Sequence, residues 1–227
     1  MTTNLDGAVV AVVGASGGLG SAIARCLTER GARLVLTART VDRLDSLGIA
    51  NSCNVALDLR NADSGDALVA TANNEYGRLD GVINAAGIVA FGPLVETEDT
   101  VIEELFLTNV LGPLWLIKRV APALAKSKGF FVNISAVVAE SPLPGMVAYA
   151  ASKAALTAAD QALVRELRRQ HIRVCDARPP HTETGLADRA IAGVSPPLPQ
   201  GLTPARVAER IVAAIEANET DISAEQF

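Results

Sequence analysis

The chain alternates short, almost wholly apolar runs with longer stretches in which apolar residues recur every three or four positions. The first pattern is typical of buried parallel strands and the second of amphipathic helices. Strands are predicted at residues 8–13, 33–38, 54–57, 79–84, 129–134, 172–177 and 221–224. Helices are predicted at residues 19–30, 42–47, 62–75, 99–111, 113–126, 146–170 and 203–217, with a break at Gly112 and Pro113.

Strands that alternate with crossover helices favour an α/β fold with a doubly wound parallel sheet, about seven strands wide, with helices on both faces. The sequence shows no repeat and no linker, so residues 1–227 are expected to form a single domain. In an open sheet of this kind, ligands bind beyond the carboxyl ends of the strands. Functional residues are therefore expected in the segments that follow the predicted strands.

The composition fits this fold, because 49% of the residues are hydrophobic but only 4% are aromatic. A core of small and branched aliphatic side chains suits buried strands covered by closely packed helices. The three cysteines lie far apart without metal-ligand spacing, so they are interpreted as core residues of a cytoplasmic protein without a metal site. A net charge of -5 argues against nucleic-acid binding, and the lack of a long uninterrupted apolar run argues against a membrane partner.

A glycine-rich segment, VVGASGGLG, joins the first predicted strand to the first predicted helix. Glycines at such a turn let the backbone approach a pyrophosphate, which the free N–H groups and positive end of the helix then stabilise. Gly14, Gly18 and Gly20 are spaced G-x-x-x-G-x-G, which differs from the commonest dinucleotide fingerprint, G-x-G-x-x-G. A tight turn without a ligand is the alternative, but its position at the start of a doubly wound sheet favours dinucleotide binding.

The end of the second predicted strand indicates which dinucleotide is used. NAD enzymes carry an acidic residue there for the ribose hydroxyls, whereas this chain has Ala38 followed by Arg39. A guanidinium can pair with the 2′-phosphate of NADP(H) through charge-assisted hydrogen bonds. NADP(H) is therefore the preferred cofactor and NAD(H) the alternative, and Arg43 could share the role of Arg39. An exposed arginine at a strand end is the other interpretation of Arg39.

The segment YAASK places Tyr149 and Lys153 four residues apart in a predicted helix. Side chains at this spacing lie on the same face, so the phenol and the ammonium come together. A cation near a phenol favours the phenolate, which makes Tyr149 a candidate for proton transfer at neutral pH. A surface pair is the alternative, although the chain contains only one other tyrosine, Tyr76.

These motifs follow one another as they do in the short-chain dehydrogenase/reductase family, which the chain resembles along nearly its whole length. The resemblance rests on the glycine turn, on NAAG at residues 84–87, on TNVLGP with Asn109, on NIS with Ser135, and on YAASK with Tyr149 and Lys153. It implies that Asn109, Ser135, Tyr149 and Lys153 are catalytic.

The resemblance also implies a role for each of these four residues. Tyr149 would donate the proton to the carbonyl oxygen, and Lys153 would activate Tyr149 and hold the nicotinamide ribose. Ser135 would bind the substrate oxygen. Asn109 would support the helix and the water through which protons return.

The residues that contact the cofactor are likewise implied by the resemblance. They are Gly14, Ser16, Gly18, Leu19, Gly20, Arg39, Asp58, Leu59, Asn84, Ala85, Gly87, Tyr149, Lys153, Pro179, Thr182 and Thr184. Two positions depart from the family pattern: Val13 replaces a threonine before the first glycine, and Pro180 stands where glycine is usual. Because proline fixes φ and lacks an N–H, the approach of this loop to the nicotinamide carboxamide is expected to differ.

The substrate pocket is expected to be largely apolar, with Glu140 as its one charged group. Its residues are Val89, Phe91, Val137, Val138, Glu140, Leu143, Met146 and His181. His181 is interpreted as a pocket or loop residue rather than a metal ligand. Residues 185–201, which contain three prolines, are expected to cover the substrate.

The resemblance implies an oxidoreductase that transfers a hydride between NADP(H) and a small carbonyl compound or secondary alcohol. A catalytically silent NADP(H)-binding sensor or interaction protein is the alternative, because a fold does not establish activity.

The predicted helices that contain Trp115 and Tyr149 are apolar on more than one face, and in the family such helices form a subunit interface. A homodimer or homotetramer is therefore expected.

Overall fold

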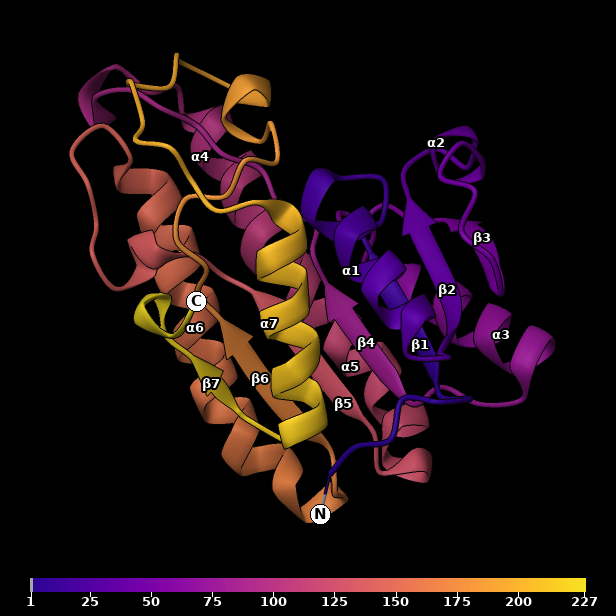
Figure 1. The fold of residues 1–227 in the computed structure, drawn as a ribbon. Coiled ribbons are helices and arrows are strands. Elements are labelled where there is room, and N and C mark those ends of the chain that lie inside the picture. Colours follow the sequence, from indigo (N-terminus) through magenta and orange to yellow (C-terminus); the bar gives the residue numbers. More distant parts are fainter. Residues whose placement is uncertain (1) are drawn as a thin grey trace.

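The computed structural model describes residues 2–227 and contains a seven-stranded sheet in the order β3-β2-β1-β4-β5-β6-β7 (Figure 1). All neighbouring strands are parallel. The strands are β1 (Val9–Val13), β2 (Arg33–Ala38), β3 (Ser52–Ala56), β4 (Gly81–Asn84), β5 (Phe130–Ile134), β6 (Arg173–Ala177) and β7 (Asp221–Ile222). From β1 the chain adds β2 and β3 on one side, and then adds β4 to β7 on the other side. The order of the strands therefore switches between β1 and β4, which is where doubly wound sheets bind ligands. The predicted fold class is confirmed.

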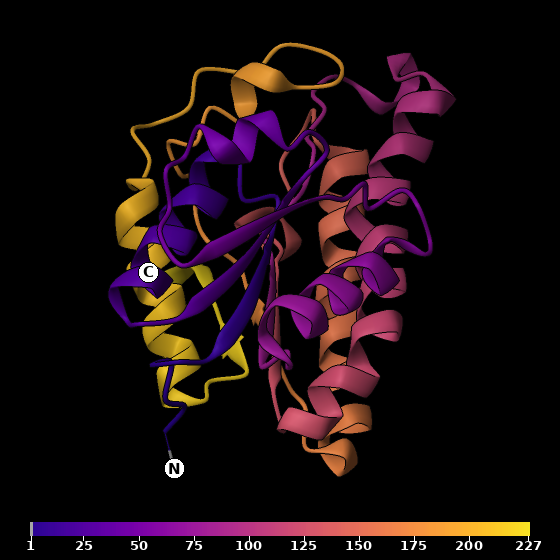
Figure 2. The ribbon, with the colours of Figure 1, turned by 90° about the vertical axis from the view of Figure 1, so that its right-hand side faces the viewer.

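Helices cover both faces of the sheet, and Figure 2 shows the two layers on either side of it. The helices are α1 (Gly18–Glu29), α2 (Asp42–Asp45), α3 (Ser64–Tyr76), α4 (Asp99–Phe106), α5 (Gly112–Ser127), α6 (Val147–Glu166) and α7 (Pro204–Ala217). On one face, α1 and α7 bury Ile23 and Ile211 against the strands. On the other, α3 and α5 bury Leu68 and Leu116. Since both faces are covered, the strands are mostly apolar on both sides instead of alternating, with a few buried polar residues such as Asn133 and Asp176.

The predicted break at Gly112 and Pro113 is wrong, because the helix runs on from Asp99 to Ser127. A widened π-helical turn, Leu107–Leu111, joins α4 to α5. Pro113 has no N–H for the carbonyl four residues before it, and the wider turn accommodates that loss without ending the helix. By length and mean hydropathy (1.4) this 29-residue helix meets the requirement for crossing a membrane, a criterion that core helices of globular proteins also meet.

Besides the apolar clusters on the two faces of the sheet, a third apolar cluster lies beyond the carboxyl ends of the strands. It contains Val89, Phe91, Val138, Met146 and Tyr149. Backbone hydrogen bonds join the loops that supply it: Phe91 N–H donates to the Ala192 carbonyl (2.9 Å), and Ile191 N–H donates to the Val89 carbonyl (2.9 Å). This cluster forms one wall of the cavity described next.

Candidate active site

A cavity of about 410 Å³ opens at the carboxyl ends of the strands. Its lining includes every residue that the sequence assigned to the site except Asn84, Asn109 and Glu140. The glycine turn lines the same cavity as Ser135, Tyr149 and Lys153. The fold therefore brings together residues that are more than a hundred positions apart in the sequence.

Close backbone contacts fix the glycine turn. Gly14 has a φ of +79°, and a Cβ added there would lie 2.8 Å from the backbone of Ala86. A Cβ at Gly20 would lie 2.3 Å from the Gly14 carbonyl oxygen, and one at Gly18 would lie 2.8 Å from the Thr184 carbonyl oxygen. Side chains at these positions would collide with neighbouring backbone, so glycine is needed for these segments to pack this closely.

The first turn of α1 is open to an anion. No side chain caps its N-terminus, and no acidic residue lies in its first turn. Arg39 and Arg43 line the same cavity, and neither has a carboxylate within ion-pair distance among residues 2–227. Unpaired N–H groups and arginines suit the phosphate groups of a dinucleotide, so the residues present fit such a cofactor.

Arg60 is a cavity residue that the sequence analysis missed. Its Nη2 donates to Asp58 Oδ2 (2.6 Å) and its Nη1 to Glu104 Oε1 (3.0 Å). The hydrogen bond from Arg60 lowers the pKa of Asp58, so this carboxyl group is ionised at neutral pH. Asp58 was predicted to contact the cofactor, and in the structure it also holds Arg60 in the cavity wall.

Tyr149 and Lys153 are both buried, with 7% and 4% of their surface exposed. Lys153 Nζ donates a hydrogen bond to the Ile134 carbonyl oxygen (2.9 Å). Burial lowers the pKa of Lys153 to about 8, against the opposing attraction of Asp176 and Asp160. Burial also raises the pKa of Tyr149, so without a ligand the phenol stays protonated, which is opposite to the direction expected from the sequence.

Asn109 lies in the widened turn between α4 and α5 and does not line the cavity. Its Oδ1 accepts a hydrogen bond from Ile88 N–H (3.0 Å), and its Nδ2 donates to the Ile88 carbonyl (2.9 Å) and to Ser152 Oγ (3.1 Å). The side chain therefore joins the loop after β4 to α6. Asn84 does not line the cavity either, and its Nδ2 donates to Asn133 Oδ1 (2.9 Å).

Ser135 lines the cavity, but its hydroxyl group donates a hydrogen bond to the buried carboxylate of Asp176.

Glu140 does not line the cavity, which corrects the prediction that it is the charged group of the pocket wall. Its carboxylate instead accepts a hydrogen bond from Arg178, a buried cation that attracts it away from the apolar wall. The sequence analysis did not single out Asp176 or Arg178.

The loop after β6 closes the other side of the cavity. Thr182 Oγ1 donates to the Pro180 carbonyl (2.8 Å), and His181 lines the cavity with its Nε2 3.5 Å from Glu183 Oε1. Further along, Arg189 and Leu198 also line the cavity, so residues 185–201 cover part of it. Among residues 2–227, no group of three or more His, Cys, Asp or Glu side chains is placed to hold a metal ion.

The fold and the cavity define an α/β protein with its candidate site at the switch point of a doubly wound sheet. The family description "short chain dehydrogenase" matches residues 8–194. The protein named Dehydrogenase/reductase SDR family member 7B, from Bos taurus, is 33% identical over 98% of this chain and 74% of its own length. The chain therefore belongs to the short-chain dehydrogenase/reductase family of oxidoreductases.

Solved structures agree with this assignment. A short chain dehydrogenase from Burkholderia cenocepacia, in complex with NADP, is 25% identical with a TM-score of 0.86, over 98% of this chain and 90% of that chain. A short chain dehydrogenase/reductase from Burkholderia phymatum, in complex with NAD, is 26% identical with a TM-score of 0.85, over 97% of this chain and 90% of that chain.

Proposed function

We propose that this protein is an NADP(H)-dependent reductase of small carbonyl compounds that also works in reverse on secondary alcohols. The observation that carries the proposal is the single cavity in which Ser135, Tyr149 and Lys153 face the same space as the glycine turn and Arg39. A dinucleotide held by the turn and the arginine extends toward the reacting groups in a fold of this kind.

NADP(H) is the preferred cofactor in this proposal, with NAD(H) as the alternative. The support is that Arg39 and Arg43 line the cavity near the end of β2, where no carboxylate pairs with them among residues 2–227. An arginine can bind the 2′-phosphate that distinguishes the two dinucleotides. One of the two similar Burkholderia proteins binds NADP and the other NAD, so their structures are compatible with either.

The glycine turn and Arg39 would hold the dinucleotide, which when bound would supply a hydride to the carbonyl carbon and so leave negative charge on the carbonyl oxygen. Tyr149 then donates its phenol proton to that oxygen, which requires a protonated phenol at neutral pH. Burial raises the pKa of Tyr149 and so keeps the proton on it until the substrate oxygen takes it.

Lys153 keeps a positive charge next to the reacting groups at neutral pH. Its pKa of about 8 lies above neutrality, and its Nζ is held by the Ile134 carbonyl. The charge stabilises the phenolate that forms when Tyr149 gives up its proton. Asn109 acts through the backbone of Ile88 and through Ser152, so it positions the loop and the helix instead of touching the substrate.

The test is a screen of cyclohexanone, acetophenone, benzil and menadione with NADPH, followed at the nicotinamide absorbance. Reduction of at least one compound by the wild type, lost in Tyr149→Phe, is the expected result. A wild type that binds NADPH and reduces none of them would favour the silent NADP(H)-binding alternative.

We also infer a homodimer or homotetramer. Leu111, at the junction of α4 and α5, and Val147, at the start of α6, are exposed apolar side chains on the helices expected to form the interface. Light scattering of the purified protein measures the oligomeric state.

We also propose that the protein is located in the cytoplasm. The support is that its three cysteines form no disulfide, and cell fractionation tests the proposal.

A further inference from the structure

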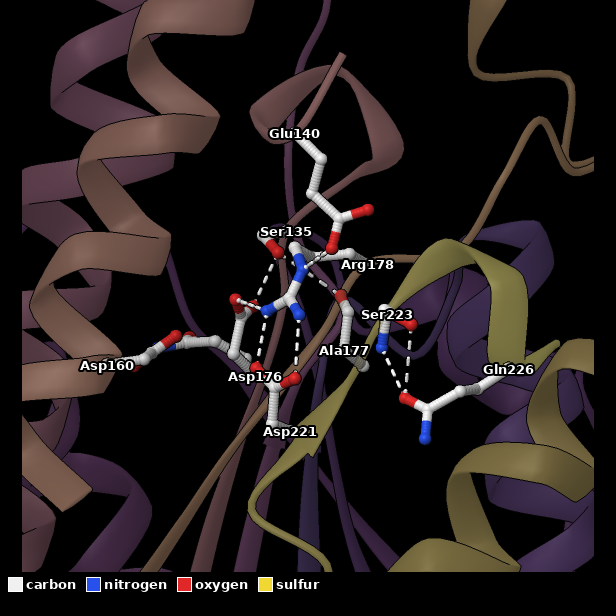
Figure 3. A network of polar contacts seen from close by, with 10 residues as sticks. Ser135, Glu140, Asp160, Asp176, Ala177, Arg178, Asp221, Ser223 and Gln226 are labelled. Atoms are coloured by element: carbon white, nitrogen blue, oxygen red, sulfur yellow. Dashed lines mark hydrogen bonds and ion pairs between the residues drawn. The ribbon is translucent and has the colours of Figure 1, made fainter.

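A buried charge cluster lies directly behind Ser135. Its carboxylate, Asp176, and its guanidinium, Arg178, have only 2% and 5% of their surface exposed. The Ser135 hydroxyl group donates to Asp176 Oδ1, with the Ala177 carbonyl oxygen as a longer second acceptor (3.3 Å), and Arg178 Nη1 donates to Asp176 Oδ2 (2.6 Å). Dashed lines in Figure 3 join Asp176 to both residues, and each of its oxygens is held by a different donor.

The sheet register places this cluster. Asp176 pairs with Asn133 of β5 on one side and with Asp221 of β7 on the other. Ser135 follows the end of β5, and Arg178 follows the end of β6. Because β5 and β6 are parallel neighbours, the two residues lie at the carboxyl ends of adjacent strands. Side chains two positions apart in a strand point to the same face, so Asp176 and Arg178 lie together.

Arg178 is itself fixed from the outer side. Its Nη1 and Nη2 donate to the two oxygens of Asp221 (2.7 and 2.8 Å), and its Nε donates to Glu140. Planar, doubly paired guanidinium groups have little freedom to move. Asp176 therefore stays in place as an acceptor for Ser135, whether or not a ligand is in the cavity.

The position of the Ser135 proton has a consequence for the proposed reduction. A carboxylate is an ionised acceptor and binds a hydroxyl proton more strongly than the neutral oxygen of a carbonyl substrate does. When hydride transfer places negative charge on the substrate oxygen, that oxygen becomes an ionised acceptor too. Only at that stage can it compete with Asp176 for the Ser135 hydroxyl group.

We propose that Asp176, anchored by Arg178, is a positioning residue that withholds the Ser135 hydroxyl from the ground-state carbonyl and releases it to the oxyanion. Ser135 then contributes to the rate but not to substrate binding, because its hydrogen bond to the substrate exists only in the transition state. The inference rests on the proposed carbonyl reduction. It assigns a function to a buried ion pair, an arrangement that by itself is weak evidence for a role in stability.

The first test is Ser135→Ala, assayed with whichever of cyclohexanone, acetophenone, benzil or menadione the wild type reduces with the highest kcat/KM. We expect kcat to fall by about a hundredfold, the usual effect of removing one oxyanion donor. KM for the carbonyl compound should stay within about twofold, since an interaction made only in the transition state does not affect it. A KM that rises with Ser135→Ala would show a ground-state hydrogen bond and overturn the proposal.

The second test is Asp176→Asn, which keeps the shape of the side chain but removes its charge. Its amide can accept from Arg178 and donate to Ser135 Oγ, which frees the serine proton for the carbonyl oxygen. KM should fall by about three- to tenfold, the usual value of one neutral hydrogen bond. Adding Ser135→Ala to Asp176→Asn should raise KM again by the same factor, and additive effects of the two changes would overturn the proposal.

Asp221→Asn is the matched control, because it makes the same change of charge on the outer side of Arg178 without touching Ser135. Its KM should stay within about twofold of the wild type, and a fall equal to that of Asp176→Asn would overturn the proposal. Should Asp176→Asn fail to fold, judged by thermal melting and NADPH binding, Ser135→Ala alone decides. A wild type that reduces none of the four compounds overturns the proposed function, whereas an active wild type without the KM pattern overturns only this inference.

Discussion

Two parts of the cavity lining are built in different ways. The cofactor end, formed by the glycine turn with Arg39 and Arg43, uses backbone contacts between neighbouring segments and leaves both arginines without a carboxylate partner among residues 2–227. The reacting wall, formed by Ser135 with α6, is buried, and Ser135 and Lys153 already have hydrogen-bond partners inside the protein.

This difference suggests that one part of the lining determines the affinity for the dinucleotide and the other determines the rate of the reaction. Free cations and open N–H groups gain partners only when a ligand arrives, so the cofactor end should determine how tightly the dinucleotide binds. Buried polar groups that already have partners are held in place before the substrate arrives, so the reacting wall should determine the rate. Substitutions in the two parts are therefore expected to change different measured quantities.

The largest effect is expected at the reacting wall, from Tyr149→Phe. This change removes only the hydroxyl group, so the carbonyl oxygen loses its proton donor while the ring still fills its buried position. The kcat for reduction should fall by about a hundred- to ten-thousandfold, the range of general acid catalysis, and the Kd for NADPH should change little. Steady-state kinetics and NADPH fluorescence measure the two quantities, and a fully active variant would contradict the assigned role of Tyr149.

The next effect concerns the buried charge of Lys153. Its pKa in the folded protein, about 8, lies below the ordinary value of 10.5, so folding disfavours the charged form. Between these values the unfolded chain binds the proton more tightly than the folded protein does. The contribution of Lys153 to the free energy of unfolding therefore rises as pH increases from about 8 to about 10.5, by about 3 kcal/mol at most.

Lys153→Met provides the reference for this measurement. Other groups titrate in an overlapping range with the opposite sign: desolvation raises the pKa of the partly buried Tyr76 and of the buried Cys175 to about 12, which lowers stability at high pH. Urea unfolding of both proteins at several pH values gives the difference between them, in which those shared contributions cancel. A difference that stays constant across the range would mean that Lys153 is not desolvated in the folded protein.

The cofactor end was predicted from the sequence more completely than the reacting wall. The glycine turn and Arg39 follow directly from strands whose ends could be recognised by their apolar runs, so neighbours in the sequence were enough to place them. The Tyr149 and Lys153 pair was also local, because one helical turn joins the two residues.

The remaining features depend on partners far away in the chain. Glu140 and Asp221 hold Arg178 from 38 and 43 residues away, so no local pattern reveals that Glu140 points away from the cavity. Asp176 near the end of an apolar strand, with Arg178 two positions on, is a signal that was present in the sequence. The uninterrupted helix at Gly112 could not be predicted, since Pro113 normally ends a helix and only the widened turn removes the conflict.

Arg39→Gln tests the cofactor end, with a smaller expected effect than the loss of Tyr149. Removing a cation from a charge-assisted hydrogen bond should weaken NADPH binding by about ten- to a hundredfold. NADH lacks the 2′-phosphate, so its Kd should not change, and this makes it the internal control. Fluorescence titration with both dinucleotides gives the answer, and equal or better use of NADH by the wild type would remove the basis for an NADP(H) preference.

The smallest effect is expected from Gly18→Ala, because the cofactor end depends on close contact between backbones. The added Cβ would lie 2.8 Å from the Thr184 carbonyl oxygen, so the loop after β6 must shift. The free energy of unfolding should fall by about 1–2 kcal/mol, and the Kd for NADPH should rise, since both segments line the cavity. Gly17→Ala is the matched control, with its Cβ at a looser 3.3 Å from the Gly14 carbonyl oxygen. If both variants melt and bind NADPH alike, packing at Gly18 does not shape the cofactor end.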